Sequence, residues 1–299
     1  MRRPAPRSLS DIRHPGPSAI NRLPHARCLA KPLEISLAEQ TPLLEALGRF
    51  ATHQGLSSAV LDLSGLTLEA FDFVMPACAI DDRHAAWYSD THSSKGATLE
   101  SAVAILGIRD GEWFAHVHAY WREEEVEQLG HLLPHTLKVA HQGAIKGYGL
   151  QGAAFVASLD PETEFTLFRV QQDDEQSRTT DHNALITTLA PFADLTDSIQ
   201  ELAKELKAPS YQVYGLGSLA GAAFRDAQPM TGLISEILLS ANAGAKPEQE
   251  LCVPIRAVDL EGGLHRGILT AGGAPTLITC ELLIMTGSKD DLNPISETD

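Results

Sequence analysis

Five of the chain's twelve histidines lie between residues 116 and 141, where an even spread along the 299 residues would place about one. They are His116, His118, His131, His135 and His141. Neutral imidazole is a common ligand of zinc, and catalytic zinc commonly takes three protein ligands and keeps a fourth position open. The cluster therefore predicts a divalent metal site, with zinc as the favoured ion, although a half-exposed polar face would show the same clustering.

The spacing of the first two histidines suits chelation. Alternate side chains of a β-strand point to the same face, so His116 and His118 would project together, about 7 Å apart. His131 is the best third ligand, because the glycine before it permits a turn that brings the chain back. His135 and His141 are reserve ligands, or could orient a ligand through a hydrogen bond. Such a site could activate water or polarise a bound substrate.

An acidic segment, Arg122–Glu127, lies between the histidine pair and His131. Its glutamates could supply a general acid or base to metal-bound water, but a solvated hairpin loop is the favoured interpretation. No nucleophile motif or substrate pocket is apparent. The residues therefore leave open whether the chain is a metal-dependent enzyme or a metal-stabilised binding module.

The glycine-rich stretch Tyr211–Gly221 resembles a dinucleotide-binding loop, because a strand pattern runs into Gly215 and Gly217. Such a loop needs a helix directly after it to bind the pyrophosphate. Here the helix pattern precedes the strand, and Pro229 interrupts the segment after the glycines. The glycines are predicted to serve a tight turn and close packing, and no nucleotide cofactor is expected.

Charge is distributed unevenly along the chain. Residues 1–31 contain seven Lys or Arg and one acid, whereas the remainder has 16 basic and 38 acidic residues, a formal charge near −22. DNA would repel such a body, so DNA is an unlikely partner. Only the basic arm at 1–31 could favour DNA, and its composition predicts disorder.

Other compositional features bear on the compartment. No apolar run approaches the roughly 18 residues of a membrane-spanning helix, so we expect no membrane association. The four cysteines lie far apart and form no C-x-x-C pair. They predict reduced thiols in a cytoplasmic protein, without a disulfide framework or a cysteine zinc site.

The two halves of the chain repeat one order of elements. The segment from Thr41 to Gly55 has the period and end signals of a helix, and an apolar strand follows at 58–63. In the second half a helix pattern ends near Lys207, and a strand follows at 211–214. The pattern predicts an α+β fold of tandem duplicated units, each a mixed or mostly antiparallel sheet with one or two helices packed on it.

Motifs in both halves resemble one protein family. In the first half these are the H-x-H strand Phe114–Ala119, the G-H-L turn Gly130–Leu133 and the end of a β-rich run, Phe165–Arg169. The second half has divergent counterparts at Tyr214–Ser218, Ser235–Leu239 and Thr279–Leu283. Together they resemble the plants and prokaryotes conserved (PPC, or DUF296) domain, in two tandem copies that span about residues 30–288.

This resemblance implies a sandwich-like α+β unit that assembles as trimers. Prokaryotic members look like metal binders, with zinc held at a subunit junction by histidines of the two motifs. By position the ligands are His116, His118 and His131. Arg169 falls where the family often has an arginine near the same cleft. We therefore expect a homo-oligomer, trimer-like or pseudo-symmetric.

The sequence departs from the family pattern at two places. Plant members associate with DNA through an Arg-Gly-Arg-Pro AT-hook, and Met1–Arg7 lacks the glycine of that hook. In the second half the ligand positions read Pro254–Arg256 and Gly267–Leu269, which contain no histidine. We therefore expect one metal site per chain, with the second copy as a structural partner.

These observations divide the chain into five parts. They are a disordered basic arm at 1–31, a PPC-like domain with the histidine site at 32–170, a linker at 171–183, a degenerate PPC-like domain at 184–288 and a tail at 289–299. The expected function is binding of a divalent metal, extended to metal-dependent hydrolytic or lyase chemistry on a small molecule. The alternatives are a DNA-associated regulatory protein, as in plant AT-hook members, and a non-catalytic binding or assembly module.

Overall fold

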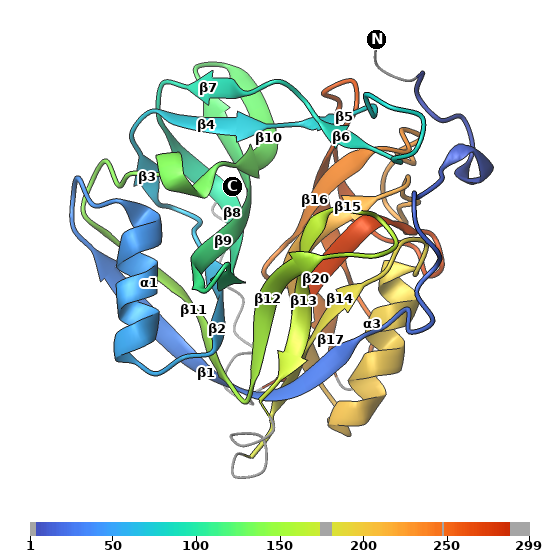
Figure 1. Ribbon diagram of the computed structural model, residues 1–299. Helices are drawn as coiled ribbons and strands as arrows, with labels where there is room; N and C mark the ends of the chain where they lie inside the picture. The colour runs from blue at the N-terminus through green and yellow to red at the C-terminus, as the bar shows by residue number, and fades with distance from the viewer. Residues whose placement is uncertain (1–3, 174–180, 247, 288–299) are drawn as a thin grey trace.

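Two β-sheets pack face to face, and each carries a helix on its outer side (Figure 1). The computed structural model describes residues 4–173, 181–246 and 248–287. One long strand, β1 (His25–Leu37), pairs with strands of both sheets. Residues 25–28 lie antiparallel to β14, and residues 29–37 lie antiparallel to β11. The halves of the chain are therefore joined by a shared strand as well as by packing.

The first sheet contains the histidine strands. Its strands follow the antiparallel order β1, β11 (Gly143–Gln151), β2 (Ser58–Asp62), β8 (Ala97–Arg109), β9 (Glu112–Glu123), β10 (Val126–Leu132), β4 (Phe71–Val74) and β7 (His92–Ser94). Among the smaller strands, β3 (Thr67–Leu68) pairs with β8. β12 (Ala153–Leu159) and β13 (Thr166–Gln172) form a hairpin, and β5 (Pro76–Ala77) and β6 (Trp87–Tyr88) form a separate pair. One parallel bridge joins β12 to β8, which makes the sheet mixed.

The second sheet repeats the strand order of the first. Its antiparallel strands are β14 (Ala184–Leu189), β20 (Thr276–Thr286), β15 (Tyr211–Leu219), β16 (Ser235–Leu239), β18 (Pro254–Asp259) and β19 (Leu264–Ile268), with the short β17 (Gly244–Ala245) beside β15. They correspond in order to β1, β11, β2, β8, β9 and β10. The predicted α+β fold with a mostly antiparallel sheet is confirmed.

Each helix follows the first strand of its half. α1 (Leu43–His53) buries a stripe that includes Leu47, and Gly55 follows its end with a φ of +61°. α3 (Leu195–Ala203) begins after Asp194, whose carboxylate accepts hydrogen bonds from two free backbone N–H groups of the first turn. Short 3-10 helices lie at Leu9–Asp11, Pro134–Thr136 and Lys204–Leu206. The two predicted helices therefore lie where the apolar period placed them.

Alternation along the strands divides the apolar side chains among three layers. In β2, Leu61 packs beneath α1 while Val60 faces the other sheet. In β16, Ile237 packs beneath α3 while Leu238 faces the first sheet. Burying a side chain of this size contributes about 1.5–3 kcal/mol. The space between the sheets is therefore a core in its own right, and any polar side chain there needs a partner.

The N-terminal arm differs from the prediction of disorder through residue 31. Residues 25–31 belong to β1. Ile12 is only 6% exposed and packs in an apolar cluster, and Arg22 forms an ion pair of 2.6 Å with the buried Glu162. Composition alone did not predict that the arm is ordered, because its scattered apolar and basic side chains contact their partners only in the folded protein.

Two glycine predictions have different outcomes. Gly130 lies inside β10 and not in a turn, which corrects the prediction. A Cβ at this position would lie 2.9 Å from Phe73 Cδ2 and 3.0 Å from the backbone carbonyl oxygen of Val74. Glycine is needed because β4 approaches closely. Gly215 and Gly217 lie inside β15 and not in the predicted tight turn. At Gly215, a Cβ would lie 2.2 Å from the backbone carbonyl oxygen of Glu281, so the predicted close packing is confirmed.

The remaining boundaries concern the linker and the tail. β13 ends at Gln172 and β14 begins at Ala184, and most of the predicted linker and the whole predicted tail lie outside the described residues. Within the described residues, no helix is long and apolar enough to cross a membrane. None of the four cysteines, all of which lie in the described residues, forms a disulfide.

Candidate metal centre

Neighbouring strands bring three predicted ligands together. His116 and His118 alternate on β9 and point into the space between the sheets, and the β9–β10 hairpin pairs His118 directly with His131. The ring centroids of His116 and His131 lie 4.6 Å apart, and those of His118 and His131 lie 5.3 Å apart. The returning chain is therefore an antiparallel strand, where the sequence had suggested a turn at the glycine.

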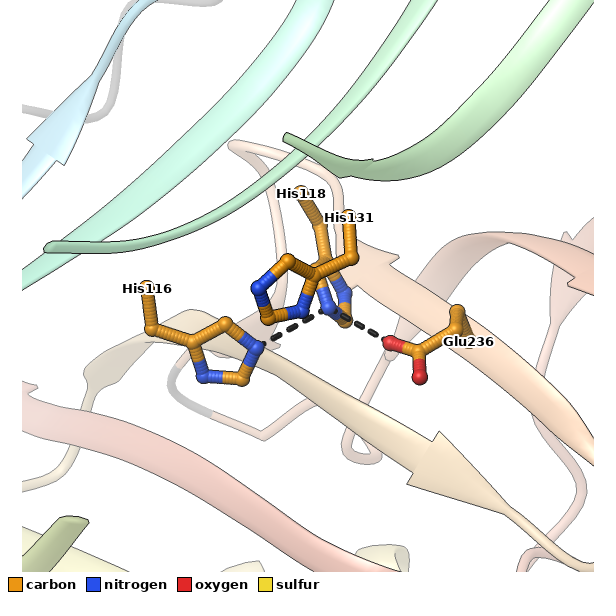
Figure 2. Close-up of side chains that lie close together, drawn as sticks. All are labelled: His116, His118, His131 and Glu236. Atoms are coloured by element: carbon orange, nitrogen blue, oxygen red, sulfur yellow. Dashed lines mark hydrogen bonds and ion pairs between the residues drawn. The ribbon is translucent and has the colours of Figure 1, made fainter. Parts of the chain in front are cut away.

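The second half of the chain adds a carboxylate to this cluster. Glu236, on β16, places its Oε2 atom 2.5 Å from His118 Nε2 (Figure 2). One potential ligand atom from each of the three histidines and Glu236 lies within 4.8 Å of the others. Three imidazoles and one carboxylate thus converge from both sheets, in a donor set that suits zinc and other first-row divalent metals.

Each histidine has a second partner on its outward-facing ring nitrogen. His116 Nδ1 lies 2.8 Å from Glu281 Oε2, and His118 Nδ1 lies 2.8 Å from the Ile237 carbonyl oxygen. Since both partners are acceptors, these nitrogens carry the protons and donate. His116 Nε2 and His118 Nε2, which lie 3.0 Å apart, are then left with lone pairs that face each other.

Tyr88 completes the same arrangement at His131. Its hydroxyl lies 3.1 Å from His131 Nδ1, which leaves Nε2 for the cluster. A carboxylate, a carbonyl oxygen and a hydroxyl are the groups that usually orient metal-binding histidines from outside the coordination sphere. The residues present therefore fit a bound metal: lone pairs converge inside, and partners hold the rings outside.

The charges around the cluster also favour a cation. Glu236 and Glu281 are 8% and 1% exposed, and buried carboxylates require compensation. Burial would lower the pKa of His116, but Glu281 and then Glu236 raise it above its ordinary value. Burial, followed by the charges of His116 and His118, lowers the pKa of His131 well below its ordinary value. A divalent cation would balance the two carboxylates while all three imidazoles stay neutral.

The cluster is mostly buried among the described residues. The side chain of His118 is fully buried, whereas those of His116 and Glu236 are 13% and 11% exposed. Tyr88 is 42% exposed, while its hydroxyl points inward to His131. The pKa of the Tyr88 hydroxyl is raised, first by burial and then by the charges of Glu236 and Glu281, so the hydroxyl stays protonated. A metal here would be largely enclosed, with access beside Tyr88.

Three further predicted residues lie outside the cluster. His135 and His141 are exposed, the first on the 3-10 helix that follows β10 and the second in the next loop. Arg169 pairs with Asp160 and is not a member of the cluster. In the acidic segment, the favoured hairpin interpretation is confirmed, since Arg122 pairs with Glu127 across β9 and β10 at 2.8 Å.

Sequence reasoning missed Glu236, Glu281 and Tyr88. A signal was present for the two carboxylates, because each lies inside an otherwise apolar strand with no basic neighbour, in Ser235–Leu239 and Thr279–Leu283. Acidic residues are almost never fully buried without a partner. Tyr88 carried no comparable signal. The second half, predicted as a purely structural partner, thus contributes Glu236 to the cluster and Glu281 beside it.

Comparison with known proteins gives structural matches alone, because neither a family model nor a curated protein sequence matches the chain. A metal-containing protein of Archaeoglobus fulgidus matches at 16% identity and a TM-score of 0.36, over 46% of this chain and 92% of its own. A plant- and prokaryote-conserved (PPC) protein of Pyrococcus horikoshii matches at 16% identity and a TM-score of 0.36, over 48% and 94%. One of the matched structures is thus described as a PPC protein, the family that the sequence motifs resemble. A protein of Salmonella cholerae-suis also matches, at 15% identity and a TM-score of 0.37, over 50% of this chain and 99% of its own. Each of the three matches spans about half of this chain.

Replacing Glu281 by glutamine is expected to weaken zinc binding by about 10–100-fold without abolishing it. The carboxylate contacts His116 Nδ1 and not the inner cluster. Glutamine can still accept this hydrogen bond through its amide oxygen, but it lacks the negative charge that makes the ring more basic. Zinc affinity measured by competition with a chromophoric chelator tests this. An unchanged affinity would show that Glu281 does not position His116.

Proposed function

We propose that this chain is a metal-binding protein that holds one divalent cation, zinc in the first instance, through His116, His118, His131 and Glu236. The observation that carries the proposal is the pairing of outer ring nitrogens, which turns the lone pairs of His116 and His118 toward one another. Without a cation, or added protons, those lone pairs and the Glu236 carboxylate would repel one another.

The proposed role of the metal is to link the two sheets. Three ligands come from β9 and β10, and the fourth comes from β16 in the second half. Free energy of metal binding adds to folding stability wherever the ligands are brought together only by the fold. A four-ligand, largely enclosed site of this kind favours a structural role.

We further propose that the halves arose by duplication of one PPC-like unit. Their common strand order supports this, as does the place of each helix after the first strand. After divergence one copy kept the three histidines, and the other supplied Glu236 at their junction. Assembly of whole chains into a trimer-like or pseudo-symmetric homo-oligomer remains a prediction.

Metal-dependent chemistry on a small molecule is a second candidate function. The partial exposure of His116 and Glu236 favours it, because water or a small carbonyl or carboxylate compound can approach the edge beside Tyr88. In that case the three histidines would hold the metal, and Glu236 would accept a proton from a nearby water molecule.

Cobalt(II) substitution distinguishes the two roles. The visible absorption of cobalt(II) is intense in a four-coordinate site and weak in a six-coordinate one. If Glu236 is a ligand in a closed site, the wild-type spectrum is intense and unchanged by azide, and Glu236→Gln alters it. A spectrum that shifts with azide while Glu236→Gln leaves it unchanged would instead support the open, chemical site. No cobalt spectrum at all would contradict the metal proposal.

Zinc binding is expected to release up to one proton per zinc ion from His116, because its raised pKa keeps more of it protonated than an ordinary histidine at the same pH. His131, whose pKa is lowered, is already neutral and releases none. The apparent affinity should fall about tenfold per pH unit below the folded pKa of His116. Calorimetry in buffers of different ionisation enthalpy measures the proton count, and a count of zero at pH 7 would contradict this assignment.

The metal-free protein has the opposite dependence on pH. Because the folded pKa of His116 is raised, its pairing with Glu281 contributes fully below the unfolded-state pKa of about 6.5. That contribution is lost as the pH rises through the folded pKa. Zinc therefore substitutes for a proton at this position as the pH increases.

DNA binding is not proposed. The formal charge of the chain is −16, and much of the basic arm that could oppose it packs on the folded body.

A further inference from the structure

A pair of arginines occupies, in the second half, the strand positions that two metal-site histidines occupy in the first. β18 and β19 correspond to β9 and β10 in the strand order of the sheets. In the first hairpin His118 pairs with His131, and in the second Arg256 pairs with Arg266. The motif alignment had placed Ile268 at the position of His131, and the strand pairing corrects it, because Ile268 lies opposite Pro254.

These arginines line a pocket of about 160 Å³ between the two hairpins. Its other lining residues are Tyr120, Glu127, Leu129, Ala257, Leu264 and His265. The Arg256 guanidinium lies 4.3 Å from the centre of the Tyr120 ring, which is buried. A cation–π contact of this kind holds the guanidinium plane in place without using its N–H donors.

No carboxylate of the described residues forms an ion pair with Arg256 or Arg266, although both lie in an acidic protein. Like charges directly opposite each other on paired strands destabilise a sheet. Glu127, which also lines the pocket, pairs with Arg122 at 2.8 Å, and Asp259 pairs with His265 at 2.7 Å. A hydrogen bond with Tyr120, then the charges of Arg122, Arg266 and Arg256, lowers the pKa of the Glu127 carboxyl. Arg256 and Arg266 thus line one small pocket, and neither forms an ion pair with a carboxylate of the described residues.

We propose that this pocket binds a small oxyanion, the phosphate or carboxylate group of a small molecule, between Arg256 and Arg266. Guanidinium groups match both oxyanions with two parallel hydrogen bonds, and a bound anion would relieve the repulsion within the pair. The small volume and the net negative charge of the chain favour a small molecule over a nucleic acid. Where the first half holds a cation, the second would hold an anion.

Calorimetric titration of the full chain with inorganic phosphate, and separately with succinate, tests the proposal. Sodium chloride at the same ionic strength is the blank. Wild-type protein should bind at least one of the two anions at one site, and Arg256→Gln and Arg266→Gln should each weaken binding by about tenfold or more. Arg49→Gln is the matched control, since Arg49 lies on the outer face of α1 and pairs with Glu45. It should leave binding unchanged.

Thermal unfolding separates a binding role from a structural one. Without added anion, Arg266→Gln should unfold at the same temperature as wild type or higher, because the substitution removes like-charge repulsion. Phosphate or succinate, whichever binds, should raise the melting temperature of wild type and not that of the double variant. The proposal is wrong if neither anion binds wild type, if binding survives in the double variant, or if Arg266→Gln lowers the melting temperature. Zinc content should be the same in all these variants, so the outcome is independent of the metal site.

Discussion

Removal of zinc with a chelator is expected to lower the melting temperature of the protein by roughly 10 °C. At free zinc about a thousandfold above the dissociation constant, binding adds about 4 kcal/mol to the free energy of unfolding. A domain of this size class shifts by about 2–4 °C per kcal/mol. The physical reason is that the metal-free site leaves two buried carboxylates and three crowded imidazoles between the sheets. Thermal unfolding followed by circular dichroism, in zinc-buffered and chelator-containing solutions, measures the shift.

Two variants serve as controls for this experiment. His118→Ala removes a buried side chain of the cluster, and at the same free zinc a hundredfold loss of affinity should reduce the stabilisation to about 1.4 kcal/mol, so its shift should be about a third of the wild-type shift. His135→Ala changes an exposed histidine outside the cluster and should keep the full response to chelator. If wild type itself unfolds at the same temperature in both solutions, the metal does not link the sheets.

Replacing His118 by alanine is expected to weaken zinc binding by a hundredfold or more. Structural zinc sites have apparent binding free energies of about 10–16 kcal/mol, so one of four ligands accounts for about 3 kcal/mol. His118 is the central ligand, since its Nε2 atom contacts both His116 Nε2 and Glu236 Oε2. Competition with a chromophoric zinc chelator gives the affinity of each variant.

The comparison with Glu281→Gln makes the second prediction specific. A ligand and a group that only orients a ligand should differ, with His118→Ala the more severe of the two. His135→Ala should bind zinc like wild type, because its side chain lies outside the cluster. Equal affinities for His118→Ala and His135→Ala would remove His118 from the site.

Much of the fold could be predicted from local pattern. The apolar stripe that includes Leu47 and the glycine at 55 located α1, and the corresponding period located α3. Alternation on a strand put His116 and His118 on one face without any knowledge of the partner strand. Such features depend on residues near one another in the chain, and a single sequence displays them directly.

The rest of the site depends on packing between distant segments. Glu236 lies 118 residues after His118, and only the face-to-face packing of the sheets brings their side chains together. The order of the arm likewise depends on Glu162, far along the chain from Arg22. Gly130 was interpreted as a turn residue because sequence alone does not show that β4 passes over it. Periodicity identifies a strand, but it does not identify the strand that packs against it.

The most direct test of the metal centre is elemental analysis of purified protein after dialysis without chelator. Wild type would be compared with His116→Ala, His118→Ala and His131→Ala, and with His135→Ala as the control. The structure predicts about one zinc per chain in wild type and in His135→Ala, and little in the other three. If wild type retains no metal even after zinc is supplied, or if the three variants retain as much as wild type, the cluster is a polar face and not a metal site.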